Sequence, residues 1–139
     1  MSTQKSQIYQ ITKEALEKLL TYTDIEKISL KTIEGEWETA VRKFSTSTTL
    51  AEKSCPKETF CTICLSGELK GLNFQKDLLD GKNADYAREL IRLLKTGKYS
   101  KDNQKELWSK VSEKYNKGKN FADNGQVDVA LVFYELGYI

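Results

Sequence analysis

The stretch NADYARELIRLLKTG, residues 83–97, decides the fold class, because its apolar residues return every three or four positions. Tyr86, Leu90 and Leu94 fall on one face of a helix, while charged residues occupy the other face. Gly97 supplies the left-handed residue that ends many helices. This stretch therefore predicts an amphipathic helix that ends near residue 97.

Five further segments are expected to be helical: residues 8–20, 32–44 and 103–115 from the same spacing, residues 56–66 from residues typical of helix boundaries, and residues 127–136 from an internal repeat. Pro56, the only proline, suits the first turn of a helix, where its missing N–H is not needed. Asn103 followed by Glu106 resembles a capping box. Residues 69–81 are expected to form a mixed connector. The expected helices are residues 8–20, 32–44, 56–66, 83–97, 103–115 and 127–136.

The last of these segments is rich in valine and aromatic residues, which favour strands, and an internal repeat decides its assignment. Three matched sets carry the repeat: Leu16, Leu19 and Leu20 with Leu90, Leu93 and Leu94, 74 residues apart; Trp37 and Phe44 with Trp108 and Tyr115, 71 apart; and Glu58, Ile63 and Gly67 with Asp128, Phe133 and Gly137, 70 apart. Amphipathic helices can share leucines by chance, but the common order and the closing glycines argue against chance. Residues 127–136 therefore inherit a helix from residues 56–66.

These patterns predict an all-α protein with six main helices, arranged as two tandem, similar three-helix halves packed into one domain. The single domain spans residues 1–139, and the repeats cover roughly residues 8–72 and 83–139. A length of 139 residues suits one core. The formal net charge of +2 gives no global attraction to nucleic acid or to an anionic membrane.

The absence of long apolar runs predicts where the protein resides. No segment is apolar enough to span a membrane or to act as a signal peptide. Three cysteines, an odd number, fit reduced thiols better than a disulfide framework. We therefore expect a cytoplasmic protein with no membrane partner.

The cysteines follow a C-x5-C-x2-C pattern at Cys55, Cys61 and Cys64, which invites a zinc or redox interpretation. A structural zinc site needs four ligands, and the chain has no histidine, so neither a metal nor a cofactor is expected. Cys61 and Cys64 share a helix face and are expected to pack in the core. Cys55 is a weak catalytic candidate, because a helix N-terminus near Lys53 and Lys57 favours its thiolate. No base is evident, so a capping role is favoured.

A lysine-rich run, the Lys95–Lys119 surface, contains eight lysines and only three acidic residues. Tyr99 and Tyr115 interleave with the lysines, so the run could bind phosphates and stack on bases. It contains no arginine, and lysine is also common on solvated helix faces. The candidate contacts for nucleic acid or another phosphate anion are Lys98, Lys101, Lys105, Lys117 and Lys119.

Two other features allow a ligand as an alternative to a structural role. The loop STSTT, residues 45–49, places hydroxyl groups before a helix start, an arrangement that can bind anions. It lacks the glycine-rich phosphate loop that nucleotide hydrolysis needs. Trp37 and Trp108 could serve as ligand platforms, but their matched positions favour core anchors.

Three stretches carry a resemblance to a known family: SCPKETFCTICLSGELKGL (54–72), KELWSKVSEKY (105–115) and NGQVDVALVFYELGYI (124–139). They resemble the signature stretches of an uncharacterised bacterial family that pairs a serine-rich loop and Cys-Pro-Lys with a closing apolar helix. The resemblance implies an architecture and no activity.

The sequence favours a non-enzymatic protein-interaction or regulatory module whose partner is another protein, because no triad, carboxylate pair, metal set or phosphate loop emerges. One alternative is nucleic-acid or phosphate-anion binding through the Lys95–Lys119 surface. A second is a cysteine-dependent enzyme that uses Cys55. A local function is expected where the halves disagree, at Cys55 against Gly125 and at residues 45–49 against 116–120.

Overall fold

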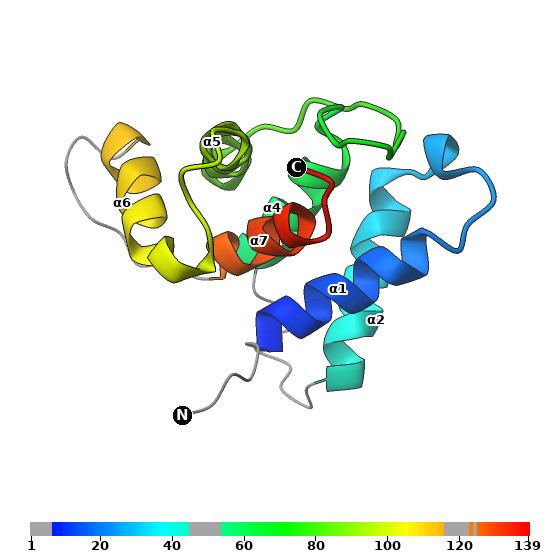
Figure 1. Ribbon diagram of the computed structural model, residues 1–139. Helices are drawn as coiled ribbons and strands as arrows, with labels where there is room; N and C mark the ends of the chain where they lie inside the picture. The colour runs from blue at the N-terminus through cyan, green and yellow to red at the C-terminus, as the bar shows by residue number, and fades with distance from the viewer. Residues whose placement is uncertain (1–6, 45–53, 116–122, 124) are drawn as a thin grey trace.

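The computed structural model describes residues 7–44, 54–115, 123 and 125–139, which form six α-helices, two short 3₁₀-helices and no strand (Figure 1). The all-α prediction is confirmed for these residues. The predicted anion loop 45–49, Lys117 and Lys119 lie outside them. The helices are α1 (Gln7–Leu19), α2 (Leu30–Phe44), α4 (Ser54–Cys64), α5 (Lys82–Lys95), α6 (Gln104–Tyr115) and α7 (Gln126–Glu135), and the 3₁₀-helices are η1 (Ile25–Lys27) and η2 (Lys101–Asn103).

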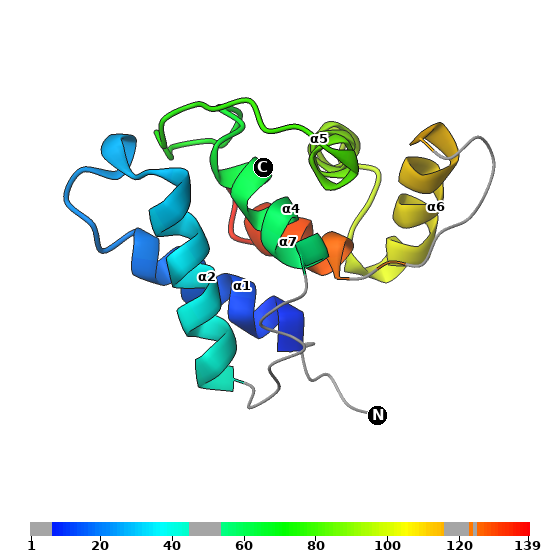
Figure 2. The same cartoon turned by 180° about the vertical axis from the view of Figure 1, so that it is seen from behind.

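Helices α4 and α7 pack against each other at the centre, between the α1–α2 pair and the α5–α6 pair (Figures 1 and 2). The ring of Phe60 on α4 lies 5.2 Å from Trp37 of α2 and 5.8 Å from Phe133 of α7, measured between centroids. All three side chains are fully buried. The helix predicted for residues 127–136 is confirmed as α7. Its valines are buried on most sides of a helix, and they do not form a strand.

The α5–α6 pair has its own aromatic contacts. The ring of Tyr86 on α5 meets Trp108 edge-on at 5.3 Å and lies 6.0 Å from Tyr115, both on α6. Trp37 and Trp108 are both buried, which confirms their interpretation as core anchors.

The start of α6 differs from the prediction. The Asp102 N–H donates to the Ser100 hydroxyl at 3.2 Å, and the Ser100 N–H donates to Oδ1 of Asn103 at 2.6 Å. The capping box therefore pairs Ser100 with Asn103, not Asn103 with Glu106. The predicted pairing was wrong because the turn of η2 precedes α6 and moves the cap three residues back.

Several arrangements agree with the predicted duplication, which stays a prediction. Helix α1 packs on α2 and on α7, while α5 packs on α6 and on α4. Gly67 and Gly137 both end a third helix with a left-handed backbone, at φ 75° and 88°. Two residues after each glycine, Leu69 and Ile139 are buried.

The connector between α4 and α5, residues 65–81, contains no helix and crosses the surface in turns and extended chain (Figure 1). Its Leu72 and Phe74 side chains are buried. The Lys70 N–H donates to the carbonyl oxygen of Tyr138 at 2.8 Å, so the connector is attached to the end of α7 as well as to α4.

Candidate functional site

The lysines predicted to contact anions lie, where the structure describes them, between the end of α5 and the first turn of α6. Lys98, Lys101 and Lys105 are exposed, and none of them forms an ion pair with another described residue. Asp102 and Glu106 are exposed among them and reduce the local positive charge. The structure therefore brings three of the five candidates into one region of modest charge.

Two other lysines of the same run are engaged in ion pairs with other elements. The Lys95 ammonium lies 3.1 Å from the carboxylate of Glu68 in the connector. The Lys114 ammonium lies 3.0 Å from the carboxylate of Glu89 on α5, a side chain that is only 4% exposed. These lysines neutralise carboxylates and join elements, so they add little to an anion-binding surface.

Glu89 is the most deeply buried carboxylate of the described residues, and two cations hold it. Hydrogen bonds from Arg92 lower the pKa of Glu89 below its usual value, a hydrogen bond from Lys114 adds to the effect, and burial opposes it. The carboxylate therefore stays ionised, and its ion pair with Lys114 joins α6 to α5. Its geometry fits a structural role.

Cys55 lies in the first turn of α4 with its side chain half-buried. Its thiol forms no hydrogen bond with a described residue. Glu58, one turn further along α4, accepts from the Asn83 amide at 3.1 Å, and Asn83 accepts from the Gln126 amide at 3.2 Å. The carboxylate that could serve as a base is thus engaged in a network that joins α4, α5 and α7.

The other two cysteines are core residues, as predicted. Cys61 and Cys64 are each 2% exposed. Burial raises the pKa of Cys61 to about 12 and raises the pKa of Cys64 well above its usual value, so both remain thiols. Among the described residues, no group of three or more histidine, cysteine, aspartate or glutamate side chains could hold a metal ion.

Gly125, the matched position of Cys55, has a structural reason to be glycine. Its φ is +101°, and a Cβ there would lie 3.2 Å from Cγ1 of Ile8 and 3.6 Å from Cβ of Pro56. A left-handed turn and the close approach of α1 therefore explain why glycine stands at this position, where the predicted repeat would place a residue equivalent to Cys55.

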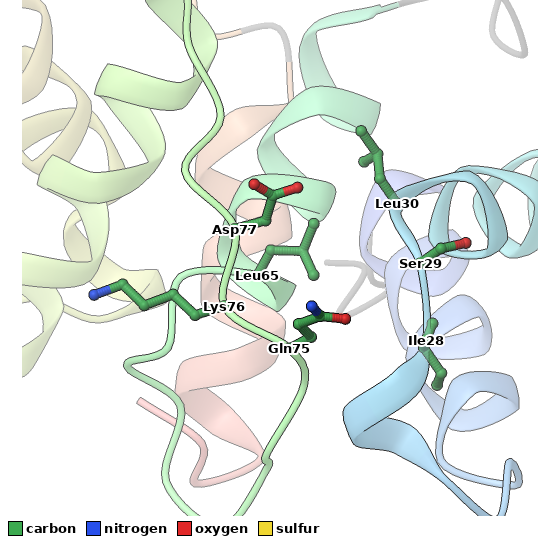
Figure 3. A pocket seen from close by; sticks show the side chains of 7 residues that line it. All are labelled: Ile28, Ser29, Leu30, Leu65, Gln75, Lys76 and Asp77. Atoms are coloured by element: carbon green, nitrogen blue, oxygen red, sulfur yellow. The ribbon is translucent and has the colours of Figure 1, made fainter.

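A pocket of about 270 Å³ lies between two connectors, one leading from η1 into α2 and the other joining α4 to α5 (Figure 3). We call it the connector cleft. Its lining residues are Ile28, Ser29, Leu30, Leu65, Gln75, Lys76 and Asp77. Ile28 and Leu65 are buried and form an apolar floor, whereas residues 75–77 are exposed and form a polar rim.

Local hydrogen bonds hold both walls of the cleft. The Thr32 N–H donates to the Ser29 hydroxyl at 3.2 Å, so Ser29 caps α2 and the helix begins at Leu30, two residues before the predicted start. On the opposite wall, the Asp77 N–H donates to the carbonyl oxygen of Leu65 at 2.9 Å. The cleft is therefore formed without a bound partner.

Sequence reasoning missed this cleft. Residues 75–77 follow no helical period, and their contact with residues 28–30 joins positions far apart in the chain. The only available signal was the mixed composition of residues 69–81, which indicated a connector but not what it touches.

The described residues define a class, an all-α domain of six helices with a preformed surface cleft. None of the described helices is long and apolar enough to cross a membrane. Residues 12–139 match a family of unknown function (DUF6979), and the chain belongs to this family. This confirms the expected resemblance to an uncharacterised family. No curated protein and no solved structure matches the chain.

Proposed function

We propose that this protein is a non-enzymatic interaction module that binds a segment of a partner protein in the connector cleft. The observation that carries the proposal is the combination of an apolar floor at Ile28 and Leu65 with a polar rim at residues 75–77. Binding sites commonly combine apolar lining with a few polar groups that fix orientation.

The preformed walls support the same proposal. The Ser29 cap and the hydrogen bond between Asp77 and Leu65 hold the two connectors in place before any partner arrives. A partner segment would therefore not have to order this surface, and more of the contact energy would remain for binding.

The test is selection of peptides from a displayed random library against the whole chain. A selected peptide is then measured on Gln75→Trp, which fills the cleft, and on Asn73→Trp, which places the same side chain on an exposed residue of the connector outside the lining. We expect Gln75→Trp to weaken binding at least about tenfold and Asn73→Trp to leave it unchanged. Equal binding to both variants, or no enriched peptide, would contradict the proposal.

A second candidate is nucleic-acid or phosphate-anion binding, which the exposed and unpaired Lys98, Lys101 and Lys105 favour. The test is a gel shift with the triple Lys→Glu variant at these positions. The control is a triple Lys→Glu variant at three exposed lysines elsewhere, namely Lys13, Lys18 and Lys31. A shift that weakens with salt and is lost only in the first variant supports this function, and the absence of a shift at low salt contradicts it.

We do not propose catalysis through Cys55. The thiol has no hydrogen-bonding base among the described residues, and Glu58 is engaged with Asn83. Activation of a thiol needs such a base or a lowered pKa.

A further inference from the structure

The charged side chains of the connector cleft face in different directions. The aliphatic stem of Lys76 lies over Gly67, where a Cβ would be only 3.0 Å from Cδ of Lys76. Its ammonium group therefore extends away from the Ile28–Leu30 wall, as Figure 3 shows. The positive charge of the rim is directed out of the cleft.

The other polar groups at the cleft, a carboxylate and an amide that can accept or donate, have no partners among the described residues. Neither the Asp77 carboxylate nor the Gln75 amide takes part in a hydrogen bond or ion pair with another described residue. The Ser29 hydroxyl, by contrast, is engaged with Thr32 as the helix cap. The cleft thus offers one anionic acceptor and one neutral amide beside an apolar floor.

The volume limits the size of the occupant. The cleft holds about 270 Å³, below the roughly 300–1,000 Å³ of pockets that bind drug-sized ligands. A cleft of this volume has room for a single large side chain of a partner segment.

We propose that the occupant is an arginine side chain of a partner protein, an inference that rests on the proposed function of the cleft. The methylene stem of arginine packs on the half-buried Leu30, above the buried Leu65 and Ile28, as long basic side chains do on apolar surfaces. The planar guanidinium group then donates to the two oxygens of the Asp77 carboxylate, while the Gln75 side chain borders the stem. The guanidinium fork of donors matches a carboxylate.

Other occupants fit the same groups less well. An anionic side chain would meet the Asp77 carboxylate with like charge. A purely apolar side chain would cover that carboxylate without giving it a hydrogen bond, which is costly. Lysine carries a compact charge that pairs with one acceptor more readily than with two.

The experiment is an NMR titration of the whole chain with acetyl-Ala-Arg-Ala-amide and with the same peptide containing citrulline, which keeps the shape of arginine and removes its charge. We expect the arginine peptide to shift the methyl signals of Ile28, Leu30 and Leu65, with the citrulline peptide at least about tenfold weaker. Asp77→Asn should bring the arginine peptide down to the citrulline level. Circular dichroism of the variant checks that it is folded.

Two results would overturn the inference. If both peptides shift the same methyl signals equally, the cleft binds peptides without selecting arginine, and the proposed function stands alone. If neither peptide shifts these signals, the arginine inference is wrong. The library selection with Gln75→Trp then tests separately whether the cleft binds a partner segment at all.

Discussion

Trp37 carries the one buried side-chain nitrogen or oxygen of the described residues that has no hydrogen-bond partner, its indole Nε1. The substitution Trp37→Phe removes this N–H together with two ring carbons, so two effects oppose each other. Burying an unsatisfied N–H costs about 1–3 kcal/mol, which the substitution recovers. The lost carbons contribute about 0.8 kcal/mol each, and the cavity left behind brings the cost to about 2–3 kcal/mol. The midpoints of the two ranges differ by about 0.5 kcal/mol, so we expect the free energy of unfolding to fall by about that amount, and by no more than about 2 kcal/mol.

Trp108, which the predicted repeat matches with Trp37, provides the control. Trp108 is also buried, at 6% exposure. Its indole N–H, however, is not among the buried side-chain groups that lack a hydrogen-bond partner. Trp108→Phe should therefore lose the full amount of about 2–3 kcal/mol. In a chain of 139 residues, a difference of about 1–3 kcal/mol between the variants corresponds to about 3–12 °C in Tm.

Urea and thermal unfolding followed by far-UV circular dichroism measure both variants without relying on tryptophan fluorescence. A loss of stability in Trp37→Phe that equals or exceeds the loss in Trp108→Phe would contradict this expectation. That result would mean that the Trp37 N–H has an acceptor in solution or that its packing outweighs the unsatisfied donor.

Three further predictions concern backbone, charge and thiols. Gly125→Ala should cost about 1–3 kcal/mol in urea unfolding, more than Gly71→Ala, whose Cβ would have open space; equal losses would exclude a steric contribution. The pKa of Glu89 is lowered in the folded state, so its ionised carboxylate stabilises the fold above the pKa of the unfolded chain, and this stabilisation is lost as the pH falls. The free energy of unfolding of Glu89→Gln should therefore decrease less steeply with falling pH than that of the unmodified protein; parallel curves would contradict this. In a thiol-labelling assay of the native protein, Cys55 should react and the two core cysteines should react only on unfolding; fast labelling of all three would contradict their burial.

Much of the fold could be predicted from the sequence because the apolar periodicity of a helix can be detected within one short stretch of chain. The apolar spacing of α5 repeats within a single stretch, so no knowledge of distant contacts is needed. The case of α7 is different, since its apolar residues surround most of the helix and show little periodicity. Comparison with residues 56–66 supplied what periodicity could not.

The ion pairs and the cleft could not be predicted, because their partners come from separate elements. Lys114 belongs to a lysine-rich run by sequence, yet it neutralises Glu89 on another helix. Gln75 and Asp77 form part of a cleft only because folding places them beside residues 28–30, which are far away in the sequence. Composition counts charges, whereas a binding site depends on which charges already have partners.

We also propose that the chain arose by duplication of a three-helix unit. Ser29 and Ser100, which both accept hydrogen bonds at the start of a second helix or its preceding turn, are separated by the same 71 residues as Trp37 and Trp108. The segment 73–82 lies between the two predicted repeats and belongs to neither. It contributes the rim of the connector cleft, whereas the other lining residues belong to the first predicted repeat, so the proposed site combines a repeated part of the chain with an unrepeated one.

A last prediction is that the stability of the fold and binding in the connector cleft depend on different residues. Because Gln75 and Asp77 are exposed and make no side-chain hydrogen bond with another described residue, Gln75→Ala and Asp77→Asn should change the free energy of unfolding by no more than about 0.5 kcal/mol. The same variants should weaken binding of the arginine peptide. Urea unfolding and peptide titration on the same samples compare the two effects. If Asp77→Asn lost more than about 1 kcal/mol of stability, its carboxylate would be holding the fold together, and it could not be regarded as an acceptor kept for a partner.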